Sequence, residues 1–225
     1  MSSRGPRSKL VAESFAWPFR GEWKLNWLPG LLMVLLLPVA FIPLLGYAIA
    51  ATRAAELDPA QGPPRWALSS RLLSDGFWTA LVIVLLTAPF VLAFNPLAAL
   101  LFDARVWTGR DVAVSQLYAH VVSAFILALP WGLLLLLLMP HATARFAQTG
   151  KPAHLFGFPA AIRGVTGDFS TWNLVAAAIV TAWAVGLAGV GLLCVGLVPG
   201  VFYAILVSAH ASAALHDQGA NSPTR

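Results

Sequence analysis

The side chains that could act as acids, bases or nucleophiles are scattered along this chain of 225 residues. The nine acidic residues are Glu13, Glu22, Glu56, Asp58, Asp75, Asp103, Asp111, Asp168 and Asp217. None lies in a metalloprotease, nucleophile-elbow or phosphate-binding motif. His141 and His154 are 13 positions apart, with no cysteine or acidic residue at metal-ligand spacing. We therefore predict no enzyme activity, no catalytic residue, no cofactor and no metal site.

Polar residues inside apolar runs are candidates of another kind. Asn95 and Pro96 lie within the run 77–102, where an amide needs a partner and the proline frees a backbone carbonyl. The pair could line a polar cavity, or Asn95 could simply bond to a neighbouring helix, and we favour the second interpretation. His120 and Ser123 share a helix face and could form part of a proton relay, although hydration of His120 at the membrane surface is the simpler interpretation.

Two prolines and two tyrosines mark candidate hinges. Pro38 and Pro43 interrupt the apolar run 28–52. Tyr47 and Tyr203 stand at equivalent places in two similar segments, because each lies four residues after a proline and is followed by Ala-Ile. Chance similarity between apolar sequences is one explanation of this match. The other is an internal repeat of two related units.

The composition places all of these residues in a membrane. The chain is 59% hydrophobic and 10% charged, with a mean hydropathy of +0.77, whereas globular chains are about 25% charged. Residues 173–216 lack Asp, Glu, Lys and Arg, which predicts two crossings with a turn near residues 196–200. The single cysteine excludes a disulfide within the chain. We predict an all-α integral membrane protein, a multi-pass helical bundle with about five to six membrane segments.

A single helical membrane domain is predicted at 15–216, between a flexible basic tail at 1–14 and a polar tail at 217–225. Its membrane segments are predicted at 28–52, 77–102, 117–140, 173–195 and 198–216. Residues 15–27 and 141–171 mix aromatic and charged side chains, so we expect interfacial amphipathic elements there. Ser74 and Asp75 are placed to cap the helix that follows them.

The charge distribution favours one form of the first segment. If 28–52 is one kinked span, the lysines and arginines divide seven to seven across the membrane. If it is a broken, re-entrant hairpin that turns between Pro38 and Pro43, they divide twelve to two, as the positive-inside rule expects. Hairpin arms of about 11 residues would rise only about 16 Å, too little to cross the bilayer. We favour the hairpin, with both termini cytoplasmic, and keep the kinked span as the alternative.

Several segments resemble a known family. They are FAWPFRGEW at 15–23, PLLGYAIAATR at 43–53, a proline-rich loop with Trp66, the triplet at 74–76, and FYAILVSAH at 202–210. The chain resembles, over roughly 15–216, the bacterial and archaeal membrane family catalogued as domain of unknown function 4013. That family usually carries acidic residues after the loop tryptophan, where this chain has Ala67 and Leu68. The resemblance implies a multi-pass membrane protein without an assigned activity.

Two classes of function fit these observations. The first is a scaffold, assembly factor or accessory subunit, which predicts a filled core and a face of small residues open to lipid. The alternative is a transporter or channel component for apolar or lipid-like cargo, which predicts polar residues around a cavity. The expected partners are membrane lipids, including anionic headgroups attracted by the net charge of +5, and a membrane protein or a second copy of the chain, but no nucleic acid. The expected location is the cell inner (cytoplasmic) membrane.

Overall fold

The computed structural model describes residues 9–104, 111–191 and 196–215. In these ranges the chain forms eight α-helices, three short 3-10 helices and no β-strand, which confirms the predicted all-α fold. It divides into two compact units that are described one at a time. The first unit comprises Met1–Ala80 and Leu138–Arg225, and the second comprises Leu81–Leu137.

Among the described residues, four helices are long and apolar enough to cross a bilayer: α3 (Leu37–Leu57), α4 (Ser70–Asp103), α5 (Val112–Thr149) and α7 (Phe169–Ala188). The 21 residues of α3 rise about 32 Å at about 1.5 Å each, which matches a hydrocarbon core about 30 Å thick. Helix α8 (Leu197–Ala213) is also apolar but has 17 residues. By length and composition these helices support a membrane protein.

The first unit begins with α1 (Leu10–Ala16) and η2 (Trp17–Phe19), which pack on the second half of α8. Ser14 Oγ lies 2.9 Å from Nδ1 of His210 on α8. Trp17 is fully buried, with its ring centroid 5.3 Å from that of His210. The N-terminal element of the described chain is therefore part of the core.

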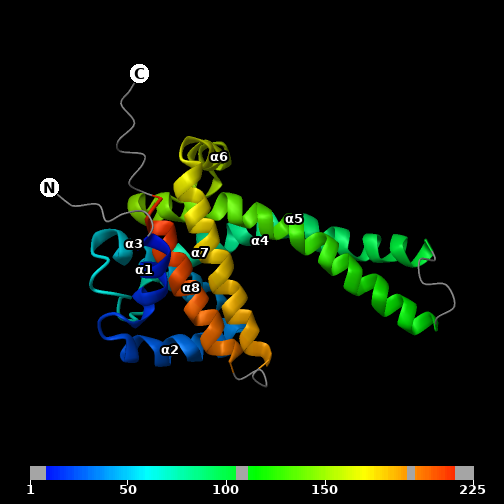
Figure 1. The fold of residues 1–225 in the computed structure, drawn as a ribbon, viewed down its shortest axis with the longest axis horizontal. Coiled ribbons are helices and arrows are strands. Elements are labelled where there is room, and N and C mark those ends of the chain that lie inside the picture. Colours follow the sequence, from blue (N-terminus) through cyan, green and yellow to red (C-terminus); the bar gives the residue numbers. More distant parts are fainter. Residues whose placement is uncertain (1–8, 105–110, 192–195, 216–225) are drawn as a thin grey trace. The chain divides into compact units, whose positions relative to one another are not determined.

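Helix α2 (Trp23–Leu35) crosses the far end of the unit and meets α3 at Leu36 (Figure 1). The chain then returns, so that α3 ends at the end of the unit where α8 also ends. The break predicted between Pro38 and Pro43 lies instead at Leu36, where α2 ends and α3 begins. Pro38 lies in the first turn of α3, where a missing N–H costs little, and the helix continues through Pro43.

Close backbone contacts join α7 to α8 in an antiparallel pair (Figure 1). A Cβ on Gly186 would lie 2.6 Å from the Gly200 carbonyl oxygen, and a Cβ on Gly189 would lie 2.5 Å from that of Gly196. The turn predicted near 196–200 is not found at residues 197–200, because α8 already begins at Leu197. The intervening residues 192–195 are outside the described ranges.

Polar segments cap one end of the first unit. Ser69 caps α4, since its Oγ accepts from the Leu72 N–H at 3.1 Å, whereas the predicted caps Ser74 and Asp75 lie inside the helix. After α5 come η3 (Pro152–Phe156) and α6 (Phe158–Gly167). Asp168 then caps α7 by accepting from the Thr171 N–H at 3.0 Å. Helix α6 keeps Ala161 and Val165 buried and Ile162 exposed, as expected for an interfacial helix.

The second unit is the hairpin formed by residues 81–103 of α4 and 112–137 of α5. Trp131 of α5 donates its indole N–H to Thr87 Oγ1 of α4 at 3.0 Å. The only side chains of the described hairpin that are fully or nearly fully buried are small or β-branched: Val82, Ala98, Ala119 and Ser123. Many of its large apolar side chains are exposed, among them Leu92, Phe125 and Leu129.

Candidate functional site

Tyr47 and Tyr203, the two tyrosines of the predicted repeat, meet around Phe202 in the core of the first unit. The Tyr47 ring stacks on Phe202 with centroids 6.0 Å apart, and Tyr203 follows Phe202 on α8. Each hydroxyl donates to a backbone carbonyl, Tyr47 to Pro64 at 2.9 Å and Tyr203 to Phe15 at 3.0 Å. The two side chains therefore have the same role, which is to hold a non-helical segment or an N-terminal helix against the core.

The segment between α3 and α4 is fixed by its contacts with α2 and α3. Trp66 stacks on Tyr47 with centroids 3.9 Å apart and an interplanar angle of 6°. Its indole N–H donates to the Asn26 carbonyl at 3.0 Å, and the Asn26 amide donates to the Pro63 carbonyl at 2.9 Å. Gly62 has φ +81°, and a Cβ there would collide with the Arg20 backbone. These contacts make the segment a structural clamp.

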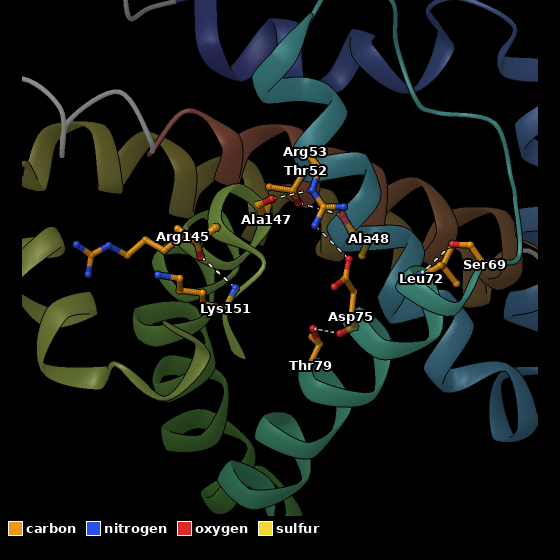
Figure 2. Close-up of polar contacts among 11 residues, drawn as sticks. Ala48, Thr52, Arg53, Ser69, Leu72, Asp75, Thr79, Arg145, Ala147 and Lys151 are labelled. Atoms are coloured by element: carbon orange, nitrogen blue, oxygen red, sulfur yellow. Dashed lines mark hydrogen bonds and ion pairs between the residues drawn. The ribbon is translucent and has the colours of Figure 1, made fainter. Parts of the chain in front are cut away.

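A polar node ties α3, α4 and α5 together within the first unit (Figure 2). Arg53 of α3 donates from Nη2 to Asp75 of α4 at 3.1 Å and from Nε to the Ala147 carbonyl of α5 at 2.7 Å. The side chains of Arg53 and Asp75 are 20% and 9% exposed. Buried charges are tolerated when they are paired and hydrogen-bonded, and both conditions are met here.

A cavity of about 350 Å³ lies beside this node. It is lined by Arg53, Glu56, Leu57, Arg71, Ala147 and Gln148. Oε1 of Glu56 is shielded from solvent and has no hydrogen-bond partner among the described residues. The cavity thus contains an unmet acceptor, at a place where α3 and α5 end and α4 begins.

Asn95 lines the second hollow, a groove of about 370 Å³ between α4 and α5 in the hairpin. The other lining residues are mostly apolar: Thr87, Phe90, Val91, Phe94, Ala124, Leu127, Ala128 and Trp131. Asn95 is exposed, and no described residue forms a hydrogen bond with its side chain. It is also the only polar residue between Ala88 and Phe102.

The remaining predicted positions lie apart from these hollows. Pro96 continues α4 immediately after Asn95. His120 is exposed, its Nδ1 lies 2.8 Å from the Gln116 carbonyl, and its ring contacts Phe94. Ser123 donates to the Ala119 carbonyl at 2.7 Å, so its proton is used within its own helix. Pro38 and Pro43 lie in α3, away from the lining of either hollow.

Sequence reasoning missed the Arg53–Asp75 node and the cavity beside it. Asp75 was interpreted as a helix cap, and no role was predicted for Arg53. A signal was present, because Asp75 is the only acidic residue between Asp58 and Asp103 and stands before a glycine. A Cβ on that Gly76 would lie 2.0 Å from the Ile42 carbonyl oxygen, so the glycine permits the close approach of α3 and α4.

Comparisons with known proteins yield one match. The family model described as "Protein of unknown function (DUF4013)" matches residues 30–196. No curated protein and no solved structure matches the chain. Within the described ranges, no group of three or more His, Cys, Asp or Glu side chains is arranged to hold a metal ion.

Proposed function

Because this chain belongs to the DUF4013 family, whose description assigns no activity, we propose a function from the surface of the chain itself. The protein is a non-catalytic scaffold, assembly or accessory subunit in the membrane. It binds another membrane protein through the hairpin of α4 and α5.

The observation that carries this proposal is the exposure of the hairpin helices. In an apolar window of 18 residues, 17% of α4 and 11% of α5 is buried. The corresponding shares are 39% for α3 and 33% for α7. Helices α3 and α7 have their partners within the first unit. The hairpin helices leave most of their apolar surface for lipid or for another protein.

Asn95 favours protein over lipid as the occupant of that surface. An amide group without a partner is costly in hydrocarbon, and asparagine side chains join membrane helices by hydrogen bonding across the contact. Pro96 adds a second unmet group, because it cannot donate to the Leu92 carbonyl one turn earlier. A second membrane helix could satisfy both groups.

The small-residue face proposed for a scaffold does not supply this contact. Gly186 and Gly189 are occupied by α8 through close approach to Gly200 and Gly196. Those glycines explain how the protein packs its own helices, and the binding surface is assigned instead to the larger apolar side chains of α4 and α5.

Site-specific photo-crosslinking tests the proposal. A photoreactive amino acid is placed at Leu92 or Phe125, which are 77% and 72% exposed on the hairpin, and at Val39, which is 87% exposed on α3. We expect a discrete protein adduct from the hairpin positions and lipid adducts alone from Val39. Asn95→Leu should reduce the protein adduct about three- to tenfold, as expected for loss of one interhelical hydrogen bond. Lipid adducts alone at all three positions would contradict the proposal.

The groove beside Asn95 favours a second candidate function, the carriage of apolar or lipid-like cargo. Its volume of about 370 Å³ lies in the range of ligand sites, and its lining is almost entirely apolar. A photoreactive fatty acid added to membranes would then label the Phe94 and Trp131 region, and Ala128→Trp would block that labelling by filling the groove. Equal labelling of the variant would exclude cargo binding there.

We also propose that the protein resides in the cytoplasmic membrane with both termini in the cytoplasm. The twelve-to-two division of cations supports this orientation. The return of the chain to one end of the first unit after α3 is compatible with it.

A further inference from the structure

The cavity beside the Arg53 node is lined by three charged side chains, Arg53, Glu56 and Arg71. Arg53 is already committed, with one bond to Asp75 and one to the Ala147 carbonyl. The two other charged side chains that line the cavity are Glu56 and Arg71, of opposite sign. Neither is in a close ion pair with a described residue, although the charge of Arg53 and a hydrogen bond with Gln148 favour the charged form of Glu56. The cavity therefore offers one negative and one positive group to a ligand.

Of these two side chains, Glu56 has the less favourable environment. Its Oε1 is shielded from solvent and lacks a donor among the described residues, although Gln148 lies beside the carboxylate. A buried carboxylate oxygen without a donor is destabilising. A ligand that carries N–H donors and a positive charge would satisfy it.

Arg71 presents the complementary group. It is exposed in the first turn of α4, and its guanidinium has donors that suit phosphate oxygens. The ligand that fits both side chains is thus a zwitterion with an ammonium at one end and a phosphate at the other.

The location of the cavity further limits which ligands could reach it. The lining comes from the last turn of α3, the first turn of α4 and the last turns of α5, all of which are ends of apolar helices. The ends of membrane helices lie at the level of the lipid headgroups. We propose that this cavity binds an ammonium phosphodiester, the headgroup chemistry of an aminophospholipid such as phosphatidylethanolamine, with Glu56 on the ammonium and Arg71 on the phosphate.

This site is independent of the proposed partner surface, because its residues belong to the first unit and the hairpin residues to the second. A failure of lipid binding at the cavity would leave the crosslinking result at Leu92 unaffected. Equally, the absence of a protein adduct at Leu92 would leave the lipid-binding result unaffected.

Native mass spectrometry of the full-length protein in detergent tests the headgroup assignment. Phosphatidylethanolamine, phosphatidylcholine and phosphatidylglycerol with identical acyl chains are titrated separately. Phosphatidylcholine lacks ammonium N–H donors, and phosphatidylglycerol lacks the cation. We expect phosphatidylethanolamine to bind about tenfold more tightly than either, as one charge-assisted hydrogen bond would give. Equal binding of all three lipids by the wild-type protein would overturn the proposal without any variant.

Two variants and a matched control locate the site. Glu56→Gln should abolish the preference for phosphatidylethanolamine, and Arg71→Gln should weaken phosphatidylethanolamine and phosphatidylcholine alike. Arg145→Gln removes an exposed cation from α5 whose side chain points away from the node (Figure 2), and it should change neither affinity. An unchanged preference in a folded Glu56→Gln protein would overturn the assignment.

A competition experiment distinguishes a membrane lipid from a soluble headgroup compound as the ligand of this cavity. Free phosphoethanolamine at millimolar concentration is added to the lipid-bound protein. Retention of the lipid supports a membrane lipid as the ligand, whereas displacement that Glu56→Gln abolishes supports the soluble headgroup compound. Both outcomes support the same pair of contacts.

Discussion

At the scale of single residues, Arg53 is a charged side chain held in a mostly buried position. It joins three helices through one ion pair and one hydrogen bond to a carbonyl, and it is largely removed from solvent. A buried pair adds little stability relative to a well-packed apolar pair, because desolvation offsets the attraction. Loss of one member is different, since it leaves the other charge buried without compensation.

Asp75→Asn should therefore destabilise the protein by about 3 kcal/mol, the lower end of the cost of breaking a buried pair. The double variant Arg53→Met with Asp75→Leu should recover most of that loss, because it removes both charges. Denaturant unfolding in a fixed detergent measures both effects.

The exposed pair of Arg65 and Glu22 is the matched control. Its side chains are 72% and 55% exposed, so Arg65→Gln should cost less than about 1 kcal/mol. A loss from Asp75→Asn no greater than that from Arg65→Gln would show that the node does not contribute as described.

Gly46 gives a second prediction at the residue scale. A Cβ there would lie 2.0 Å from the Leu72 carbonyl oxygen, so alanine must push the backbones of α3 and α4 apart. We expect Gly46→Ala to lower the free energy of unfolding by about 1 to 3 kcal/mol. Gly132→Ala on α5 has no described atom within 4 Å and should be neutral or stabilising, because alanine favours helix. Similar effects of the two substitutions in thermal unfolding would contradict this.

At the scale of elements, hydropathy and period predicted which stretches become helices, but not where several of them begin and turn. The apolar runs at 77–102 and 117–140 lie inside α4 and α5, which extend well beyond them. The extensions contain more polar side chains than the apolar runs, and they make tertiary contacts such as those of Asp75 and Ala147 with Arg53. The local sequence does not show which distant residues will become partners. For this reason Asp75 was wrongly predicted to be a helix cap.

The structural clamp between α3 and α4 also depends on contacts that local sequence does not predict, and it can be tested as one element. Trp66 was noted as a loop residue, yet it stacks on Tyr47 and bonds to Asn26, which are distant in sequence. Trp66→Ala should release the segment between α3 and α4, because both contacts are lost. Trypsin should then cleave after Arg65 about tenfold faster than in the wild type, since local opening governs proteolysis.

Trp66→Phe keeps a ring against Tyr47 but loses the hydrogen bond to the Asn26 carbonyl. Its cleavage rate should fall between those of the wild type and the alanine variant. A wild-type protein that is already cut rapidly after Arg65 would contradict the clamp.

At the scale of the whole molecule, the remaining question is which segments share a side of the membrane. Helix α1 packs on the second half of α8, and α3 also ends at that end of the first unit. The chain from α1 to α3 therefore goes to the far end and returns. Arg53 then brings the last turns of α5 to the same place through its bond to Ala147. If α4 and α5 each cross the bilayer, this arrangement predicts the twelve-to-two division of cations, which the following experiment tests.

Single cysteines in a Cys194→Ala background test this arrangement through labelling with a membrane-impermeant thiol reagent. We expect cysteines at Ala12, Ala60 and Gln148, all exposed, to stay unlabelled in intact cells and to react together once the membrane is opened. Val112, 65% exposed at the start of α5, should label in intact cells if α4 and α5 each cross the bilayer. Opposite responses at Ala12 and Ala60 would mean that residues 10–57 cross the membrane only once. The charge argument and the returning path from α1 to α3 would then both be wrong, because each places those two positions on one side.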